Sequence, residues 1–174
     1  MSELRRATAQ DGPIILTMTE ETMNWDLTRP RESLAEVART YPEIMRYTEG
    51  WGRTDDEGFV AEEDGEPLGA AWYRLFPADA PAFGFIDEAT PEIGIALAPE
   101  ARGHGIGTAL LAALFDLAHG QGFSQISLSV AIANPARRLY ERFGFVKVED
   151  DDDGYRKMVL DLSSRRRTRS AGRS

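Results

Sequence analysis

The segment PEARGHGIGTALLAAL, residues 99–114, holds three glycines at alternate positions, Gly103, Gly105 and Gly107. They lie between a short apolar stretch and a longer one with helical spacing. Glycine is unfavourable inside a strand or a helix, so this cluster indicates backbone that something approaches closely. A glycine turn before a helix directs backbone N–H groups at one point, where the helix dipole adds positive charge. The pattern predicts phosphate binding, with a ligand-free tight turn as the alternative.

Two familiar nucleotide-binding motifs do not fit this stretch. A dinucleotide-binding turn has its third glycine three positions after the second, where this chain has Thr108. The later apolar stretch ISLSV also does not end in an acidic residue that could hold a ribose. A Walker loop requires Gly-Lys-Ser/Thr, whereas Gly107 is followed by Thr108 and Ala109. The spacing argues against both motifs.

The apolar pattern around the turn predicts a mixed sheet. Strand-like runs occupy residues 3–7, 91–98, 124–130, and 155–162 paired with 145–149. Residues 58–76 alternate around Asp64-Gly65, a pair typical of the turn in an antiparallel hairpin. Both hairpins and crossover connections are implied, so we expect a mixed, mostly antiparallel sheet.

Helices are expected to cover this sheet. Helical patterns occupy residues 9–25, 32–47 and 134–144, and Pro42 breaks or restarts the second of them. The long helix after the glycines is expected to face the core through Leu110, Leu111, Leu114 and Leu117.

Composition limits the class of protein. The 174 residues are 42% hydrophobic and include no cysteine, which suits one domain and excludes disulfides, thiolate metal sites and a cysteine nucleophile. No apolar run approaches the roughly 20 residues of a membrane span, and the polar start MSELRRATAQD has no signal-peptide core. We therefore expect a cytoplasmic protein that does not bind membranes.

Charge is distributed unevenly. The net charge is −9, yet five arginines lie in the last ten residues, so the remainder carries −14. An acidic body repels nucleic-acid phosphates and favours cationic substrates. We expect one domain over residues 1–162 and a disordered Arg/Ser-rich tail over 163–174, with nucleic-acid binding through the tail as an alternative.

Two motifs carry a family resemblance. The run Arg102-Gly103-His104-Gly105-Ile106-Gly107 resembles the Arg/Gln-x-x-Gly-x-Gly/Ala acetyl-CoA motif of the GNAT superfamily of N-acetyltransferases, and NPARRLYERFGF resembles that family's later helix. The order of elements fits from about residue 4 to 162. The resemblance implies an α/β GNAT fold, with a mixed central sheet splayed between its fourth and fifth strands. It also implies acetyl-CoA as co-substrate and no metal.

The resemblance assigns residues to the co-substrate. Backbone amides of residues 103–107 and the Thr108 hydroxyl would hold the pyrophosphate, and His104 is expected to face solvent. Pantetheine would bond to the backbone of the fourth strand, often beside a bulge, and the Ile95 amide would polarise the acetyl carbonyl. Asn134 would bond the pantetheine or cap its helix. The expected set is Ile95, Leu97, Arg102, Gly103, His104, Gly105, Ile106, Gly107, Thr108 and Asn134.

Direct acetyl transfer needs a neutral amine and a proton for the departing CoA sulfur. The resemblance makes Glu92, which opens the fourth strand, the candidate base. An exposed strand-end carboxylate is the alternative, and Glu88 and Asp87 are weaker candidates. Tyr140 matches the family's tyrosine near the thioester sulfur and is the candidate acid, with core packing as its alternative.

The expected function is N-acetylation of a small cationic molecule or a peptide amine in a ternary complex. A non-catalytic acyl-CoA sensor on the same fold is the alternative. Aromatic residues could line the acceptor pocket or pack in the core: Trp25, Trp51, Trp72 and Tyr73. We expect an amine acceptor and no nucleic-acid partner, and leave a homodimer open.

Overall fold

The computed structural model describes residues 1–165. Residues 166–174, most of the expected Arg/Ser-rich tail, lie outside the described residues. The three described residues of that segment end beside α3 (Ile106–Gly120), where the Arg165 guanidinium pairs with Asp116 at 2.8 Å and lies over the Phe115 ring.

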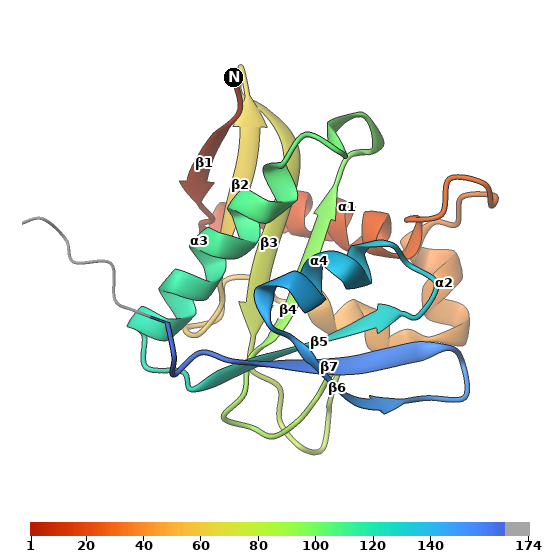
Figure 1. The fold of residues 1–174 in the computed structure, drawn as a ribbon. Helices are drawn as coiled ribbons and strands as arrows, with labels where there is room; N and C mark the ends of the chain where they lie inside the picture. The colour runs from red at the N-terminus through yellow and green to blue at the C-terminus, as the bar shows by residue number, and fades with distance from the viewer. Residues whose placement is uncertain (166–174) are drawn as a thin grey trace, which may run out of the picture.

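Residues 1–165 form seven strands, four α-helices and three short 3-10 helices (Figure 1). The strands are β1 (Glu3–Arg6), β2 (Glu57–Glu63), β3 (Glu66–Arg74), β4 (Glu92–Leu97), β5 (Gln125–Ala131), β6 (Val146–Asp150) and β7 (Tyr155–Asp161). The helices are η1 (Ala9–Asp11), α1 (Gly12–Met23), α2 (Leu34–Thr40), η2 (Pro42–Tyr47), η3 (Pro99–Ala101), α3 and α4 (Ala136–Phe143).

The strands form one mixed sheet in the order β1-β2-β3-β4-β5-β7-β6. Only the β4–β5 pair is parallel, which confirms the mixed, mostly antiparallel sheet. Asp64 and Gly65 turn the β2–β3 hairpin as expected, and Pro42 ends α2 and starts η2. The sequence therefore located these elements correctly, because each carries a strong local signal.

Hydrophobic clusters cover both faces of the sheet. Helices α3 and α4 lie on one face, and α1 and α2 lie on the other (Figure 1). The α3 side contains Leu110, Leu111, Leu114, Phe115 and Ala118, all fully buried. Leu117, expected in this stripe, is only partly buried, because the buried face continues through Phe115 and Ala118 instead. The α1 side is centred on Ile15, Trp72 and Val60.

A buried ion pair anchors η2 to the sheet. Arg74, at the end of β3, is fully buried and binds the Asp56 carboxylate through two nitrogens at 2.9 and 2.7 Å. Its third nitrogen donates to the carbonyls of Arg46 and Glu49, both at 2.8 Å. Losing either charge would leave its partner buried and uncompensated, which costs several kcal/mol. The pair thereby fixes the position of Tyr47, the last residue of η2.

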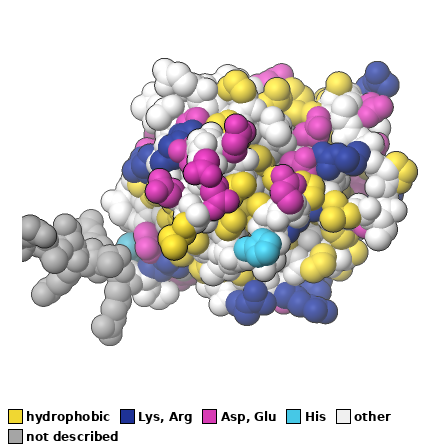
Figure 2. Space-filling model, turned by 90° about the horizontal axis from the view of Figure 1, so that it is seen from above, with side chains coloured by type: hydrophobic (Ala, Val, Ile, Leu, Met, Phe, Trp, Pro, Cys, Tyr) yellow, Lys and Arg dark blue, Asp and Glu magenta, His cyan; other side chains and the backbone are white. Residues whose placement is uncertain are grey.

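Acidic side chains are prominent on the surface. Seen from above, a group of them gathers on one face among scattered Lys and Arg side chains (Figure 2). Among the helices of residues 1–165, none is long and apolar enough to span a bilayer.

Candidate active site

The site is formed where β4 and β5 part. These strands share a single residue pair, Glu92 with Ser127, next to a hydrogen bond from Ser127 N–H to the Pro91 carbonyl at 3.0 Å. Backbone groups alternate sides along a strand, so those of Ile95 and Leu97 point toward β5 without a strand partner there. Pairing of β4 with β3 is regular from Glu92 to Leu97, so the expected bulge in β4 is absent and the strands diverge without it.

One cavity of about 600 Å³ occupies this gap. Its walls include β4, the glycine loop, α4 and the last turn of α1. Of the four aromatic residues that could line a pocket or pack in the core, Trp25 and Trp72 line the cavity, whereas Trp51 and Tyr73 do not. The indole of Trp72 lies against Gly94, where a Cβ would come within 2.5 Å of the ring. A glycine in β4 therefore lets this aromatic wall approach the strand.

The glycine loop presents unpaired donors to the cavity. Gly103 and Gly105 have φ values of +78° and +82°, and a Cβ at either would meet nothing within 4 Å. Within residues 1–165, the N–H groups of residues 103–105 donate to no acceptor. The first turn of α3 follows at once and adds its own free N–H groups and positive dipole end. This arrangement can hold an anion such as a phosphate.

Arg102 holds the loop in place. Its guanidinium donates to the Leu97 carbonyl at 3.1 Å, to the Trp25 carbonyl at 3.4 Å and to the Glu21 carboxylate at 3.3 Å. The side chain thus joins the loop to the end of β4 and to the end of α1. The sequence named Arg102 only through the motif and did not identify Glu21 as its partner.

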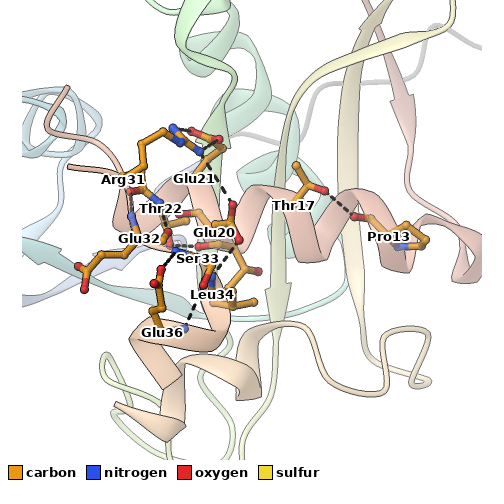
Figure 3. Close-up of polar contacts among 12 residues, drawn as sticks. Pro13, Thr17, Glu20, Glu21, Thr22, Arg31, Glu32, Ser33, Leu34 and Glu36 are labelled. Atoms are coloured by element: carbon orange, nitrogen blue, oxygen red, sulfur yellow. Dashed lines mark hydrogen bonds and ion pairs between the residues drawn. The ribbon is translucent and has the colours of Figure 1, made fainter. Parts of the chain in front are cut away.

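Polar contacts hold the segment between α1 and α2, which borders the cavity (Figure 3). Glu21 also binds Arg31, and the Glu20 carboxylate accepts the N–H of Leu34 at 2.9 Å. Ser33 and Glu36 cap the start of α2 reciprocally. These contacts fix the segment that carries Trp25, so this wall of the cavity is well defined.

Glu92 is buried rather than exposed, so the alternative of a surface carboxylate is wrong. Its side chain is 1% exposed, Oε1 accepts the Gly84 N–H at 2.9 Å, and Oε2 accepts the Tyr47 hydroxyl. Burial raises the pKa of this carboxyl to about 7, although both hydrogen bonds oppose the shift. A carboxyl with that pKa can accept a proton near neutral pH.

Tyr140 lines the cavity from α4 and packs edge-on to Phe145, with ring centroids 5.9 Å apart. Within residues 1–165, no hydrogen-bond partner is found for its hydroxyl. Burial raises the pKa of Tyr140 above its ordinary value, so the hydroxyl keeps its proton at neutral pH.

The other expected residues differ in whether they line the cavity. Asn134 lines the cavity, and its Oδ1 accepts the N–H of Ala136, the first residue of α4, at 2.9 Å, although the N-cap position of this helix is Pro135. His104 and Thr108 are exposed. The weaker candidates Asp87 and Glu88 bond to neighbouring loop residues and do not line the cavity. Their alternative role as base has no support in this geometry.

Tyr47 is the residue that the sequence did not indicate. It ends η2, the 3-10 segment that follows Pro42 within the helical pattern of residues 32–47, and it matches no motif. Residues 1–165 contain no cluster of His, Asp and Glu that could hold a metal ion.

Comparison with known families decides the class of this site. The model of the acetyltransferase (GNAT) family matches residues 19–145, which include β4, the glycine loop and α4. The chain belongs to the GNAT acetyltransferase family. Its expected fold is thereby confirmed.

Solved GNAT structures share the whole fold. The structure of yncA from Salmonella typhimurium with its cofactor acetyl-CoA is 21% identical, has a TM-score of 0.65, and covers 94% of this chain and 95% of its own. A phosphinothricin acetyltransferase from Sinorhizobium meliloti in complex with AcCoA is 25% identical, with a TM-score of 0.62, over 92% of this chain and 88% of its own.

A related GNAT sequence is a mycothiol acetyltransferase from Paenarthrobacter aurescens, 34% identical over 113 residues. The match covers 61% of this chain but 32% of the relative. This GNAT chain spans between about a third and under half of the length of the curated relatives it matches.

Exchange of Glu92 for glutamine is expected to stabilise this GNAT domain at neutral pH. Burial raises the native pKa of Glu92 to about 7, against 4.5 for the ordinary group. Between these values the native state binds more protons than the unfolded state, so Glu92 lowers the free energy of unfolding as the pH rises. The free energy of unfolding of Glu92→Gln should exceed that of wild type by an amount that grows across this pH window to at most about 3 kcal/mol.

Urea unfolding of both proteins at several pH values between about 4.5 and 8 measures the difference. The other titrating groups are the same in both proteins, so their contributions cancel in the difference between the two free energies of unfolding. A difference that stays constant, or that grows toward acid pH, would contradict a buried carboxyl with a raised pKa.

Proposed function

We propose that this chain transfers an acetyl group from acetyl-CoA to a primary amine of a small cationic molecule or a peptide, directly and in a ternary complex. The observation that carries the proposal is one cavity bordered both by unpaired loop N–H groups and by the unpaired edge of β4. The first suits a pyrophosphate, and the second suits an extended amide chain such as pantetheine. Acetyl-CoA in the complexes of yncA and of the phosphinothricin acetyltransferase supports this choice.

The residues present fit acetyl-CoA. Amides of residues 103–107 and the Thr108 hydroxyl would bind the pyrophosphate, and the open space beside Gly103 and Gly105 leaves room for it. The backbone of Ile95 and Leu97 would pair with pantetheine, and the Ile95 N–H would polarise the thioester carbonyl. Arg102 would act by holding the loop, because its donors are engaged by protein oxygens.

The reaction needs two proton movements. The amine nitrogen attacks the thioester carbon after giving up a proton, and Glu92 is the base that takes it. The carbon–sulfur bond then breaks, and the Tyr140 hydroxyl gives its proton to the departing sulfur. A carboxyl with a pKa of about 7 suits the first role, and a tyrosine that stays protonated suits the second.

Two carboxylates support a cationic acceptor. Asp151 and Asp153, in the turn between β6 and β7, line the same cavity and form no ion pair within residues 1–165. A positively charged acceptor would neutralise them. The name shared by three relatives, mycothiol acetyltransferase, supports a small molecule as acceptor.

Release of free CoA thiol from acetyl-CoA, measured across a panel of amines, tests the function. We expect amine-dependent release, fastest with acceptors that carry a second positive charge, and an acetylated product by mass spectrometry. Binding of acetyl-CoA without release by any amine would instead favour the acyl-CoA sensor.

Gly105→Val should weaken acetyl-CoA binding about tenfold or more. The branched side chain enters the space beside the free N–H groups, and valine is strained at a φ of +82°. Gly65→Val is the matched control, because Gly65 has a φ of +81° with open space around it in the β2–β3 turn. Calorimetric titration should show the loss for Gly105→Val alone; equal affinities would make the loop a turn without a ligand.

Tyr140→Phe should lower turnover about 100-fold while acetyl-CoA affinity changes little. The substitution removes one oxygen and keeps the ring that packs on Phe145, so stability should stay near that of wild type. A thiol with a pKa of about 8.5 leaves more easily in alkali, so the deficit should shrink as the pH rises. Turnover against pH for both proteins is the measurement, and superimposable profiles would exclude Tyr140 as the acid.

A further inference from the structure

Tyr47 connects Glu92 to the cavity. Glu92 is 1% exposed and does not line the cavity, whereas Tyr47 does. The Tyr47 hydroxyl donates its hydrogen to Oε2 of Glu92. A base must lie within hydrogen-bond reach of the proton it removes, directly or through one intervening group. The structure supplies that intervening group as a side chain.

The hydroxyl of Tyr47 has one unused acceptor position. A phenol oxygen offers one hydrogen and two lone pairs. The hydrogen goes to Glu92, and one lone pair accepts the Phe83 N–H at 3.2 Å. The Gly84 N–H, which donates to Oε1 of Glu92, also lowers the pKa of Tyr47 but forms no second hydrogen bond to its oxygen within residues 1–165. In the relay proposed next, the second lone pair accepts a proton of a molecule in the cavity that Tyr47 lines.

We propose that Tyr47 is a catalytic residue that relays the acceptor's proton to Glu92, a role that rests on the acetyl transfer proposed above. As the ammonium N–H bond breaks, its proton goes to the Tyr47 oxygen, and the Tyr47 proton goes to Oε2 of Glu92. The phenol is neutral before and after, the carboxylate becomes a carboxylic acid, and the amine keeps the electron pair for attack.

Surrounding charges favour a concerted transfer. Burial and the negative charge of Glu92 raise the pKa of Tyr47 well above its ordinary value, so a free phenolate does not accumulate. The charged group that acts on Glu92 from another strand is Lys157 of β7, which lowers the pKa of Glu92 and pairs with Glu149 at 2.7 Å. Burial keeps the pKa of Glu92 raised to about 7 despite Lys157, so the proton comes to rest on Glu92.

Aromatic packing holds the relay in position. The Tyr47 ring lies edge-on to Phe76, with centroids 5.8 Å apart, and stacks on Phe83 at 6.2 Å. The Trp72 indole N–H donates to the Tyr47 carbonyl at 3.0 Å. None of these contacts involves the hydroxyl, so Tyr47→Phe removes the relay and keeps the packing.

The test is the pH profile of kcat/KM for CoA release with a saturating supply of acetyl-CoA. Tyr47→Phe should lower kcat/KM for the amine about 100-fold near neutral pH and abolish the ionisation near pH 7 that we expect in the wild-type profile. Tyr73→Phe is the matched control: Tyr73 is a buried tyrosine whose hydroxyl bonds Gln121 at 2.8 Å outside the cavity. Its profile should match wild type.

A double-mutant cycle separates a relay from two independent effects. If Glu92 acts through Tyr47, then Glu92→Gln, Tyr47→Phe and the double variant should share one low rate and one pH profile. Losses that multiply in the double variant, or a Tyr47→Phe profile equal to wild type, overturn the relay while the acetyl transfer stands. Absence of amine-dependent CoA release by wild type overturns the proposed function itself, and the relay with it.

Discussion

The single residue pair between β4 and β5 is the constraint on which the site depends. A sheet normally satisfies its backbone groups strand by strand. Here pairing stops after Glu92 and Ser127, which leaves the edge of β4 without a strand partner at Ile95 and Leu97. The cavity forms in the resulting gap, and α3 begins beside it with its N–H groups unpaired. A longer β4–β5 ladder would fill this gap, and the backbone groups of Ile95 and Leu97 would then bond to β5.

The chemistry of Glu92 follows from where β4 begins. Its carboxyl is carried into the α1 side of the sheet, beneath Tyr47 and the loop at Phe83 and Gly84. Loss of solvent raises its pKa, and the neighbouring N–H and O–H donors keep the charged form accessible. The Arg74–Asp56 pair does not line the cavity, yet it fixes η2 and so the position of Tyr47.

Local sequence signals located most of the fold and one side of the site. Asp64-Gly65, Pro42 and the glycine loop each specify a backbone conformation, so their elements were predictable from a few residues. Burial of Glu92 was not predictable, because it depends on Tyr47, which lies 45 positions away in the sequence and packs over it. Tyr47 ends a predicted helical stretch but matches no motif, and only its contact with Glu92 indicates a functional role. The extension of the buried α3 face to Phe115 and Ala118 likewise reflects tertiary packing.

The sheet separates two hydrophobic clusters that share no residue. The glycine loop and α3 belong to one side, whereas α1, α2 and η2 belong to the other. Substitutions far apart and without common partners change stability almost independently. During evolution the apolar residues of the cluster on the α1 side can therefore change without weakening the packing beneath α3. Related proteins can therefore come to bind different acceptors in the cavity while the α3 side of the sheet changes little.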